Sequence, residues 1–233
     1  MTRVVPPRSS VCLAIACSDE VLRRLPQSDL TWLSDSERSR LQSLRAVARR
    51  DHYLAGHWLA RELLAKAFVD STRGTTIPQD WSLRDSKGQA PPVFGHDLVQ
   101  LSISHSGAWV AAAVAQQPVG IDIEQRPRLL DRAIRDLLVN PDEAAGDIDN
   151  DDLLQRWVAK EAWLKARGES ALPQQLRQLR MHASGNDVSD VICYRSDDFH
   201  FAVATSPMAT LVWNGRAGAI PAAAFRVEHR PNS

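Results

Sequence analysis

The clearest alternation of apolar and polar positions in the chain lies in the segment 118–124. Its apolar members are Val119, Ile121 and Ile123, and its acidic members are Asp122 and Glu124. Successive side chains of a β-strand point to opposite faces, so the pattern predicts a strand with an apolar face and an acidic face. Two neighbouring carboxylates repel each other, and hard oxygen ligands of this kind suit Mg²⁺. Taken alone, so short a pattern favours a surface strand with two solvated acids.

Other short apolar or alternating runs predict further strands. They cover residues 11–17, 101–106, 108–115, 191–194, 200–205 and 210–213. The segment 201–204 is similar in pattern to 109–113, which indicates two similar halves. The last dozen residues look frayed, and we expect no regular structure there.

Two helices are predicted in the first half of the chain. Ser34 and Glu37 form the capping-box pattern that starts a helix, and residues 50–68 carry apolar side chains at helical spacing. The region is rich in arginine, with Arg38, Arg40, Arg45, Arg49, Arg50 and Arg61. These guanidinium groups form either a solvated helix face or a patch that binds phosphate oxygens. The sequence favours neither alternative over the other.

Two more helices are predicted at residues 129–138 and 153–168, separated by an acidic segment that predicts a solvated loop. Helical spacing places Trp157, Lys160, Glu161, Leu164 and Lys165 of the second helix on one stripe, and Gly168 ends that helix. A surface Glu–Lys pair contributes only about 0.2–0.5 kcal/mol, which does not explain charges on a packing face. We therefore interpret the stripe as part of a site.

Ser104 and His105 together suggest a nucleophile beside its base. Adjacent strand residues face opposite sides, so these two side chains do not meet, and no third partner is evident. His105 is better explained as a hydrogen-bond donor to an anion near the acids at 122 and 124, one hairpin away. A local hydrogen bond at a strand end is the alternative.

Composition limits the class of protein. The chain has 233 residues, 44% of them hydrophobic and 24% charged, which is typical of a soluble globular protein of one large domain or two small ones. The formal net charge is zero, which argues against general nucleic-acid binding. Three unpatterned cysteines favour a reducing compartment, and no stretch is long enough to span a membrane.

The apolar run at residues 11–17 has two interpretations. Arg3 and Arg8 precede it, as in a secretion signal, but the run is short and follows two prolines. A first buried strand that ends before Asp19 explains it equally well. We favour the strand and a cytoplasmic protein.

Two segments together resemble the paired signatures of the Sfp-type 4′-phosphopantetheinyl transferases, G-[IV]-D-[IV]-E and W-x-x-K-E-[AS]-x-x-K. They are Gly120-Ile121-Asp122-Ile123-Glu124 and the segment from Trp157 to Lys165, in the order and at the interval of the family. The segment 104–107 matches the S-H-S motif of the family, and the basic region 34–61 is similar to its N-terminal half. The resemblance covers most of the chain.

The resemblance implies the 4′-phosphopantetheinyl transferase fold. This is an α/β (α+β) fold of two similar halves related by a pseudo-two-fold axis, with the active site in the cleft between them. Residues 1–115 would grip coenzyme A, and residues 116–233 would carry the metal site and the carrier-protein contacts. We expect a cytoplasmic monomer that binds neither nucleic acid nor membrane.

The resemblance also implies a reaction. The serine hydroxyl of an apo acyl or peptidyl carrier protein attacks the β-phosphate of coenzyme A. The 4′-phosphopantetheine arm moves to the serine, and 3′,5′-ADP leaves. Mg²⁺ is the expected ion, with Mn²⁺ as a substitute. The alternatives are a coenzyme A- or carrier-binding module without catalysis and a metal-dependent phosphohydrolase.

Roles follow from the resemblance position by position. The metal ligands would be Asp122, Glu124 and Glu161. Glu161 would also accept the serine proton, while Lys165 and His105 would neutralise phosphate oxygens that Ser104 helps to hold. The 3′-phosphate and adenine end would lie against Arg40, Arg49, Arg50 and Tyr53. Lys160 would shape the site, and an acidic carrier protein would meet the basic rim of Lys165, Arg167, Arg177 and Arg180.

Three positions depart from the family pattern. Gln89 stands where relatives carry a basic residue, Ser102 where they commonly carry Asn, and Ser170 where they commonly carry Gly. These changes bear on coenzyme A binding and leave the metal and base positions intact.

Overall fold

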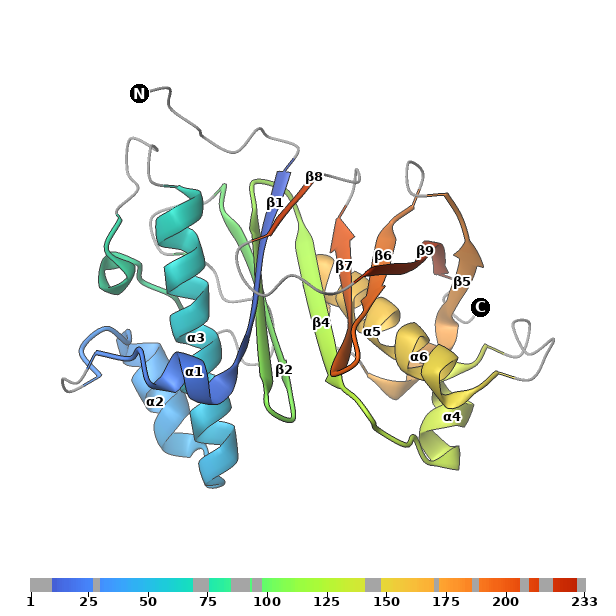
Figure 1. The fold of residues 1–233 in the computed structure, drawn as a ribbon, viewed down its shortest axis with the longest axis horizontal. Helices are drawn as coiled ribbons and strands as arrows, with labels where there is room; N and C mark the ends of the chain where they lie inside the picture. The colour runs from blue at the N-terminus through green and yellow to red at the C-terminus, as the bar shows by residue number, and fades with distance from the viewer. Residues whose placement is uncertain are drawn as a thin grey trace.

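The chain forms two β-sheets covered by helices, as seen in a computed structural model (Figure 1). The structure describes residues 10–26, 30–68, 76–84, 93, 98–140, 148–169, 172–185, 189–205, 210–213 and 220–229. Gln89 and Ser170 lie outside the described residues, as does most of the predicted acidic loop. In the part of the chain that is described, no helix combines the length and apolar character needed to cross a bilayer.

The first sheet is built mainly from the N-terminal half. The elements there are β1 (Ser10–Cys17), α1 (Ser18–Leu22), α2 (Asp35–Ser43), α3 (Val47–Ala67), a 3₁₀ turn η1 (Pro78–Asp80), β2 (Gln100–Ser106) and β3 (Trp109–Ala115). The strand order is β2-β3-β1-β8, with β1 antiparallel to β3 and β3 antiparallel to β2. The predicted strands in this half and the helices predicted from residues 34 and 50 are confirmed.

The second sheet follows in the C-terminal half. Its elements are β4 (Val119–Gln125), α4 (Arg132–Leu138), α5 (Asn150–Ala166), α6 (Pro173–Gln178), β5 (Leu179–Ala183), β6 (Val191–Arg195), β7 (Phe199–Thr205), β8 (Thr210–Trp213) and β9 (Ile220–His229). The order in the sheet is β4-β7-β6-β9-β5, whereas β8 crosses over to pair in parallel with β1. The expected frayed end is wrong, because β9 lies inside this sheet between β6 and β5.

The two halves share a topology. In the first half, β1 leads to the long helix α3 and then to the hairpin β2–β3, whose second strand pairs with β1. In the second half, β4 leads to α5 and then to the hairpin β6–β7, whose second strand pairs with β4. The similar segments 109–113 and 201–204 fall in the equivalent strands β3 and β7, so the pattern detected in the sequence marks equivalent positions.

Three hydrophobic layers hold the sheets and helices together. The first joins α3 to one face of the first sheet, the second lies between the sheets, and the third joins α5 to the outer face of the second sheet. Ile121 and Ile123 of β4 belong to the layer between the sheets. The acidic face of β4 therefore points toward α5, as the alternation predicts.

Helix α5 crosses β4 at Gly120, where no side chain could fit. A Cβ atom at Gly120 would lie 1.9 Å from the carbonyl oxygen of Ala162 and 2.5 Å from the backbone N of Ala166. These are backbone atoms of α5 that cannot rotate away. The missing side chain lets the helix approach the strand, and so brings Glu161 and Lys165 to the face that carries Asp122.

A buried ion pair fixes α2 against α3. Arg61 and Glu37 are both fully buried, and Arg61 Nη1 and Nη2 donate to Glu37 Oε1 and Oε2 at 2.9 and 2.7 Å. His57 Nδ1 lies 2.7 Å from Glu37 Oε1, and the backbone N of Ser34 donates to Oε2 at 2.7 Å within the predicted capping box. Burial raises the pKa of Glu37, but the bonds from His57 and Arg61 outweigh burial and lower it to about 2. Arg61 is thus unavailable to a phosphate patch.

The Arg61→Met variant is expected to lose roughly 3–5 kcal/mol of unfolding free energy, because it leaves the Glu37 carboxylate buried without its cation. Urea unfolding at neutral pH measures the loss. The Arg38→Met variant removes an arginine whose partner Asp35 is 97% exposed, and should change the free energy by less than about 1 kcal/mol. Equal effects of the two variants would contradict a supporting role for the buried pair.

The Gly120→Ala variant is expected to lose at least about 1–3 kcal/mol of unfolding free energy, because the new methyl group overlaps the backbone of α5. Gly185→Ala is the matched control, since a Cβ there meets nothing within 4 Å and should change stability by no more than about 0.5 kcal/mol. Urea unfolding compares the two. Wild-type stability of Gly120→Ala would show that the helix does not depend on this close crossing.

Candidate active site

The acidic face of β4 is buried under α5. Asp122 is 3% exposed and Glu124 is 7% exposed, so the alternative of two solvated surface acids is excluded. Burying a carboxylate costs several kcal/mol unless it is paired or hydrogen-bonded. The neighbours of these two acids therefore define the site.

Helix α5 supplies the opposite wall. The Asp149 side chain caps its first turn, and Gly168 follows its last turn with a φ of +70°. The backbone N of Gly168 donates to the Lys165 carbonyl and that of Glu169 to the Leu164 carbonyl, both at 3.0 Å, which is the Schellman pattern that ends helices. Gly168 therefore ends the helix as predicted, directly after the turns that hold Glu161 and Lys165.

Asp122, Ser104 and Lys165 form the centre of the site. Lys165 Nζ donates to Asp122 Oδ1 at 2.6 Å and to Ser104 Oγ at 3.1 Å, and it lies 3.8 Å from Glu161 Oε2. Ser104 Oγ in turn donates to Asp122 Oδ1 at 2.7 Å. Three elements, β2, β4 and α5, thus meet at one carboxylate oxygen.

Glu124 has its own partners on the other side. Ser106 Oγ donates to Glu124 Oε2, and Arg128 Nη1 also bonds this oxygen. The guanidinium of Arg128 lies 5.1 Å from the ring centroid of Trp157 on α5. Neither Arg128 nor Ser106 was predicted as a site residue, although Ser106 belongs to the segment 104–107 that matches the S-H-S motif. Ser106 continues the alternation of Ser102 and Ser104, a signal that was present, whereas nothing in the sequence marks Arg128.

The charges of the site perturb one another. Burial and the negative charges of Asp122 and Glu124 raise the pKa of Glu161 to about 8, although Lys165 opposes them. Burial and Asp122 also raise the pKa of Glu124. Burial lowers the pKa of Lys165, but Asp122 and Glu161 outweigh burial, so the net shift is upward. The ligand-free site thus holds one firmly charged ammonium and a proton on its carboxylates near neutral pH.

The carboxylate oxygens of Asp122, Glu124 and Glu161 are of the ligand type that a divalent cation prefers. Oδ2 of Asp122 is buried and has no hydrogen-bond partner among the described residues, and Glu161 and Glu124 carry raised pKa values that a cation would relieve. Within the same residues, no three His, Cys, Asp or Glu side chains already form a metal-binding cluster. The ammonium of Lys165 instead serves as the cation for Asp122. The donor set therefore fits Mg²⁺, but these side chains are not yet gathered around one point.

His105 lies on the face of β2 opposite to Ser104, as strand geometry predicts. Its ring stacks on His52 of α3 with centroids 4.8 Å apart. Removal from bulk water and the charges of His52, Lys165 and Arg49 lower the pKa of His105 to about 4. His105 is therefore neutral at pH 7 in the ligand-free protein, and it can offer a hydrogen bond rather than a charge.

The other predicted coenzyme A residues lie around the start of α3. Arg49 is exposed in the first turn, and its charge reaches His105. Arg50 Nη1 donates to the carbonyl of Leu41 at 2.9 Å, and Arg40 is exposed on α2. Tyr53 stacks on His57 with ring centroids 4.0 Å apart. The structure thus brings Arg49 close to the site, while Arg40 and Arg50 lie at the junction of α2 and α3.

Lys160 is separated from Glu161 although the two are adjacent. Its side chain is fully buried, and Nζ donates to the carbonyls of Leu138 at 2.6 Å and Leu176 at 3.0 Å. These carbonyls belong to the C-terminal ends of α4 and α6, where a cation is favoured by the helix dipole. Lys160 therefore ties α4 and α6 to α5 and does not face Asp122.

Comparison with known proteins agrees with this geometry. Residues 118–209 match the family described as the 4'-phosphopantetheinyl transferase superfamily. The chain is 30% identical over 135 residues to the 4'-phosphopantetheinyl transferase psf-1 of Bacillus pumilus, covering 54% of this chain and 56% of that protein. It is 36% identical over 94 residues to the 4'-phosphopantetheinyl transferase Sfp of Bacillus subtilis (strain 168), and the match covers 36% of this chain and 40% of that protein. The chain thus spans about half the length of these relatives, or less.

A shorter relative is covered almost completely. The Holo-[acyl-carrier-protein] synthase of Streptococcus pyogenes serotype M1 is 32% identical to this chain over 104 residues, which are 43% of this chain and 86% of that protein. Together with the family match over residues 118–209, which contains Asp122, Glu124, Glu161 and Lys165, this similarity shows that the chain belongs to the 4′-phosphopantetheinyl transferase superfamily.

Proposed function

We propose that this protein transfers the 4′-phosphopantetheine arm of coenzyme A to a serine of an apo acyl or peptidyl carrier protein. A bond forms between the serine oxygen and the β-phosphorus, the bond to the α-phosphate oxygen breaks, and 3′,5′-ADP leaves. The observation that carries the proposal is the meeting of Asp122, Glu161 and Lys165 across β4 and α5 in a chain of this superfamily.

Asp122, Glu124 and Glu161 are the groups that we assign to an ion, Mg²⁺ or in its place Mn²⁺. Hard oxygen ligands and a raised pKa at Glu161 support the assignment. When bound, such an ion neutralises charge on the pyrophosphate. Asp122 and Glu161 lie close to Lys165, so an ion held by these carboxylates and the ammonium would both act on the charge of the pyrophosphate.

Lys165 and His105 orient the pyrophosphate, and Ser104 supports the site. Phosphoryl transfer depends mainly on positioning and charge stabilisation, and the Lys165 ammonium supplies a fixed charge. Neutral His105 donates a hydrogen bond from its ring to a phosphate oxygen. The single hydroxyl proton of Ser104 is given to Asp122, so Ser104 acts by holding that carboxylate.

Glu161 is the group that accepts the serine proton. It lies on the helix that faces Asp122. A bound cation would lower the raised pKa that this side chain has in the ligand-free protein, so the serine proton would be removed late in the attack. Its side chain is 20% exposed, so an incoming hydroxyl has access to it. Transfer of the proton during attack avoids a positively charged ester oxygen.

The N-terminal half supplies the grip on the nucleotide end. Arg49 stands exposed beside His105, and Arg40 and Arg50 extend the positive surface toward the junction of α2 and α3. Guanidinium groups match phosphate oxygens, so the 3′-phosphate is assigned here. Tyr53 offers a ring for the adenine from the same turn of α3.

The carrier protein is assigned to the rim beyond Lys165. Arg167 and Arg177 are exposed, and Arg180 is partly exposed on β5. A positive rim steers an acidic partner and orients it. A cytoplasmic monomer with halves at residues 1–115 and 116–233 remains the prediction for the protein as a whole.

The purified protein, with Mg²⁺ and coenzyme A, is expected to add the mass of one phosphopantetheine arm to an apo carrier protein. The Asp122→Asn variant should lose at least about 100-fold in kcat/KM, because it removes a charge that holds both the ion and Lys165. Mass spectrometry of the carrier measures both. Asp35→Asn, a change at a side chain that is 97% exposed, is the matched control and should transfer normally.

Two results would contradict these assignments separately. No mass gain on any of several apo carriers from fatty acid, polyketide and peptide synthesis would refute the transferase function. Normal turnover by folded Asp122→Asn, checked by its circular dichroism, would refute the ion assignment and leave the function standing.

Without Mg²⁺, the unfolding free energy is expected to fall by roughly 2–4 kcal/mol as pH rises from about 4.5 to 8. In that window the folded protein keeps the proton on Glu161, whose pKa is about 8, while the unfolded chain releases it at an ordinary carboxyl pKa. The proton-linked stability is therefore complete below the window and lost above it. Urea unfolding across the range measures the slope, which Glu161→Gln should reduce. Adding Mg²⁺ should stabilise the wild type more at about pH 8 than at about pH 4.5. An equal effect at both pH values would contradict a carboxylate site for the ion.

A further inference from the structure

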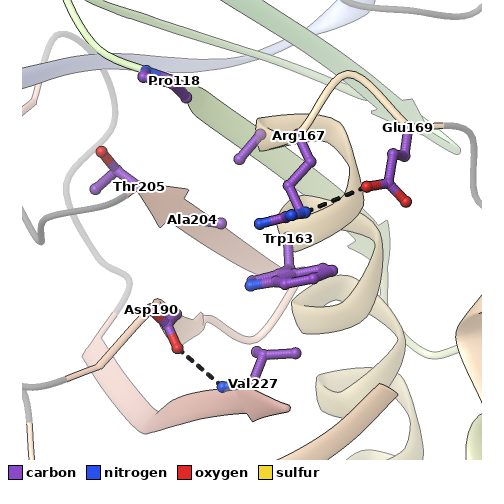
Figure 2. A pocket seen from close by; sticks show the side chains of 9 residues that line it. Pro118, Trp163, Arg167, Glu169, Asp190, Ala204, Thr205 and Val227 are labelled. Atoms are coloured by element: carbon purple, nitrogen blue, oxygen red, sulfur yellow. Dashed lines mark hydrogen bonds and ion pairs between the residues drawn. The ribbon is translucent and has the colours of Figure 1, made fainter. Parts of the chain in front are cut away.

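A cavity of about 490 Å³ opens beside the C-terminal end of α5. Figure 2 shows the side chains that line it. Its lining residues are Pro118, Trp163, Ala166, Arg167, Glu169, Asp190, Ala204, Thr205 and Val227. They come from the last turns of α5 and the residues just after it, from the residues directly before β4 and β6, from the end of β7 and from β9. A volume of this size is within the range of roughly 300–1,000 Å³ that small-molecule sites occupy.

The cavity is distinct from the site on the other side of the helix. Lys165 extends from α5 to Asp122, whereas its neighbours Trp163 and Arg167 line the cavity. Ala166 separates the two, packed against β4 where Gly120 leaves no room for a side chain. The residues that line the cavity include none of the assigned metal or phosphate ligands.

One wall of the cavity is a flat aromatic surface with an arginine laid over it. The guanidinium of Arg167 is 4.6 Å from the ring centroid of Trp163 and donates to Glu169 Oε1 at 3.2 Å. Figure 2 shows Arg167 beside the indole, with Glu169 joined to it by the ion pair. The positive charge of Arg167 is thus already paired and stacked, which leaves it less available to a ligand.

The opposite wall offers hydrogen-bond acceptors. Asp190 Oδ2 accepts from the backbone N of Val227 at 2.9 Å, and the other carboxylate oxygen makes no hydrogen bond within the described chain. Thr205 Oγ1 accepts from Gln117 Nε2 at 2.6 Å. The C-terminal end of α5 adds partial negative charge. Glu169 is neutralised by Arg167, so the negative groups left to a ligand are Asp190 and the helix terminus, and they favour a positively charged ligand.

We propose that this cavity binds a small organic cation, an ammonium or amidinium group carried on a flat apolar body. The charged group bonds the open oxygen of Asp190, and the body packs on Trp163 and the apolar side chains of Pro118, Ala204 and Val227. An aromatic face beside a carboxylate suits such molecules, because both attract positive charge. The proposal stands whether or not the protein acts as a transferase.

Binding of 2-phenylethylamine tests the proposal on the full chain labelled with ¹⁵N-tryptophan. We expect the indole N–H signal of Trp163, assigned by its loss in Trp163→Phe, to shift on titration. The neutral 2-phenylethanol and the anionic phenylacetate share the ring, and each should bind at least about 10-fold more weakly. These comparisons use the wild-type protein and so do not depend on the folding of any variant.

The Asp190→Asn variant separates charge from shape. Its amide oxygen can still accept the bond from Val227, but the negative charge is lost, so affinity for the amine should fall at least about 10-fold. Asp35→Asn, at the remote 97% exposed position, should bind the amine like the wild type. No shift with the amine, equal shifts with all three probes, or undiminished binding by Asp190→Asn would each overturn the proposal.

Discussion

The site depends on the close crossing of α5 over β4 at Gly120. A helix ordinarily packs on a sheet through side chains on both surfaces, but here the backbone of the helix replaces the missing side chain of the strand. The register of the crossing places Glu161 and Lys165 over Asp122, because two residues along a strand and one turn along a helix bring side chains back to the same face. Glycine within a strand is otherwise unfavourable, and at Gly120 this close packing offsets the cost.

The crossing also creates an electrostatic conflict that only a cation resolves. Three carboxylates are drawn toward a buried region, and in the ligand-free protein Lys165 and a proton compensate for them. Such a site is stable enough to fold. The proton and Lys165 can still be replaced as its positive charges by another cation. By contrast, the carboxylate of Glu37 is fully satisfied, since Arg61, His57 and the Ser34 backbone all bond it. The two buried acidic centres of the chain therefore differ. The centre at Glu37 stabilises the fold, whereas the carboxylates around Asp122 can accept another cation.

Local patterns predicted much of this structure, and long-range partners account for the rest. The alternation in β4, the capping box at Ser34 and the stripe on α5 depend on residues a few positions apart, so the sequence displays them. Strand β9 is held by β5 and β6, and β8 by β1, and these pairings have no local signal. The sequence pattern suggests that the long cations Arg61 and Lys160 are solvated, but both are buried and donate to partners sixteen or more residues away. The same difficulty applies to Arg128, which only the folded chain places on Trp157.

Ser104 shows how the two halves of the chain are joined at the site. Strand β4 lies at the edge of its sheet. The backbone N atoms of Ile121 and Ile123 donate to the side-chain hydroxyls of Ser102 and Ser104 on β2, and not to the backbone of a neighbouring strand. A hydroxyl has one proton to give and two lone pairs. Ser104 gives its proton to Asp122 and accepts from Ile123 and Lys165, so its capacity is fully used. A serine at this position therefore serves as a link between the two sheets.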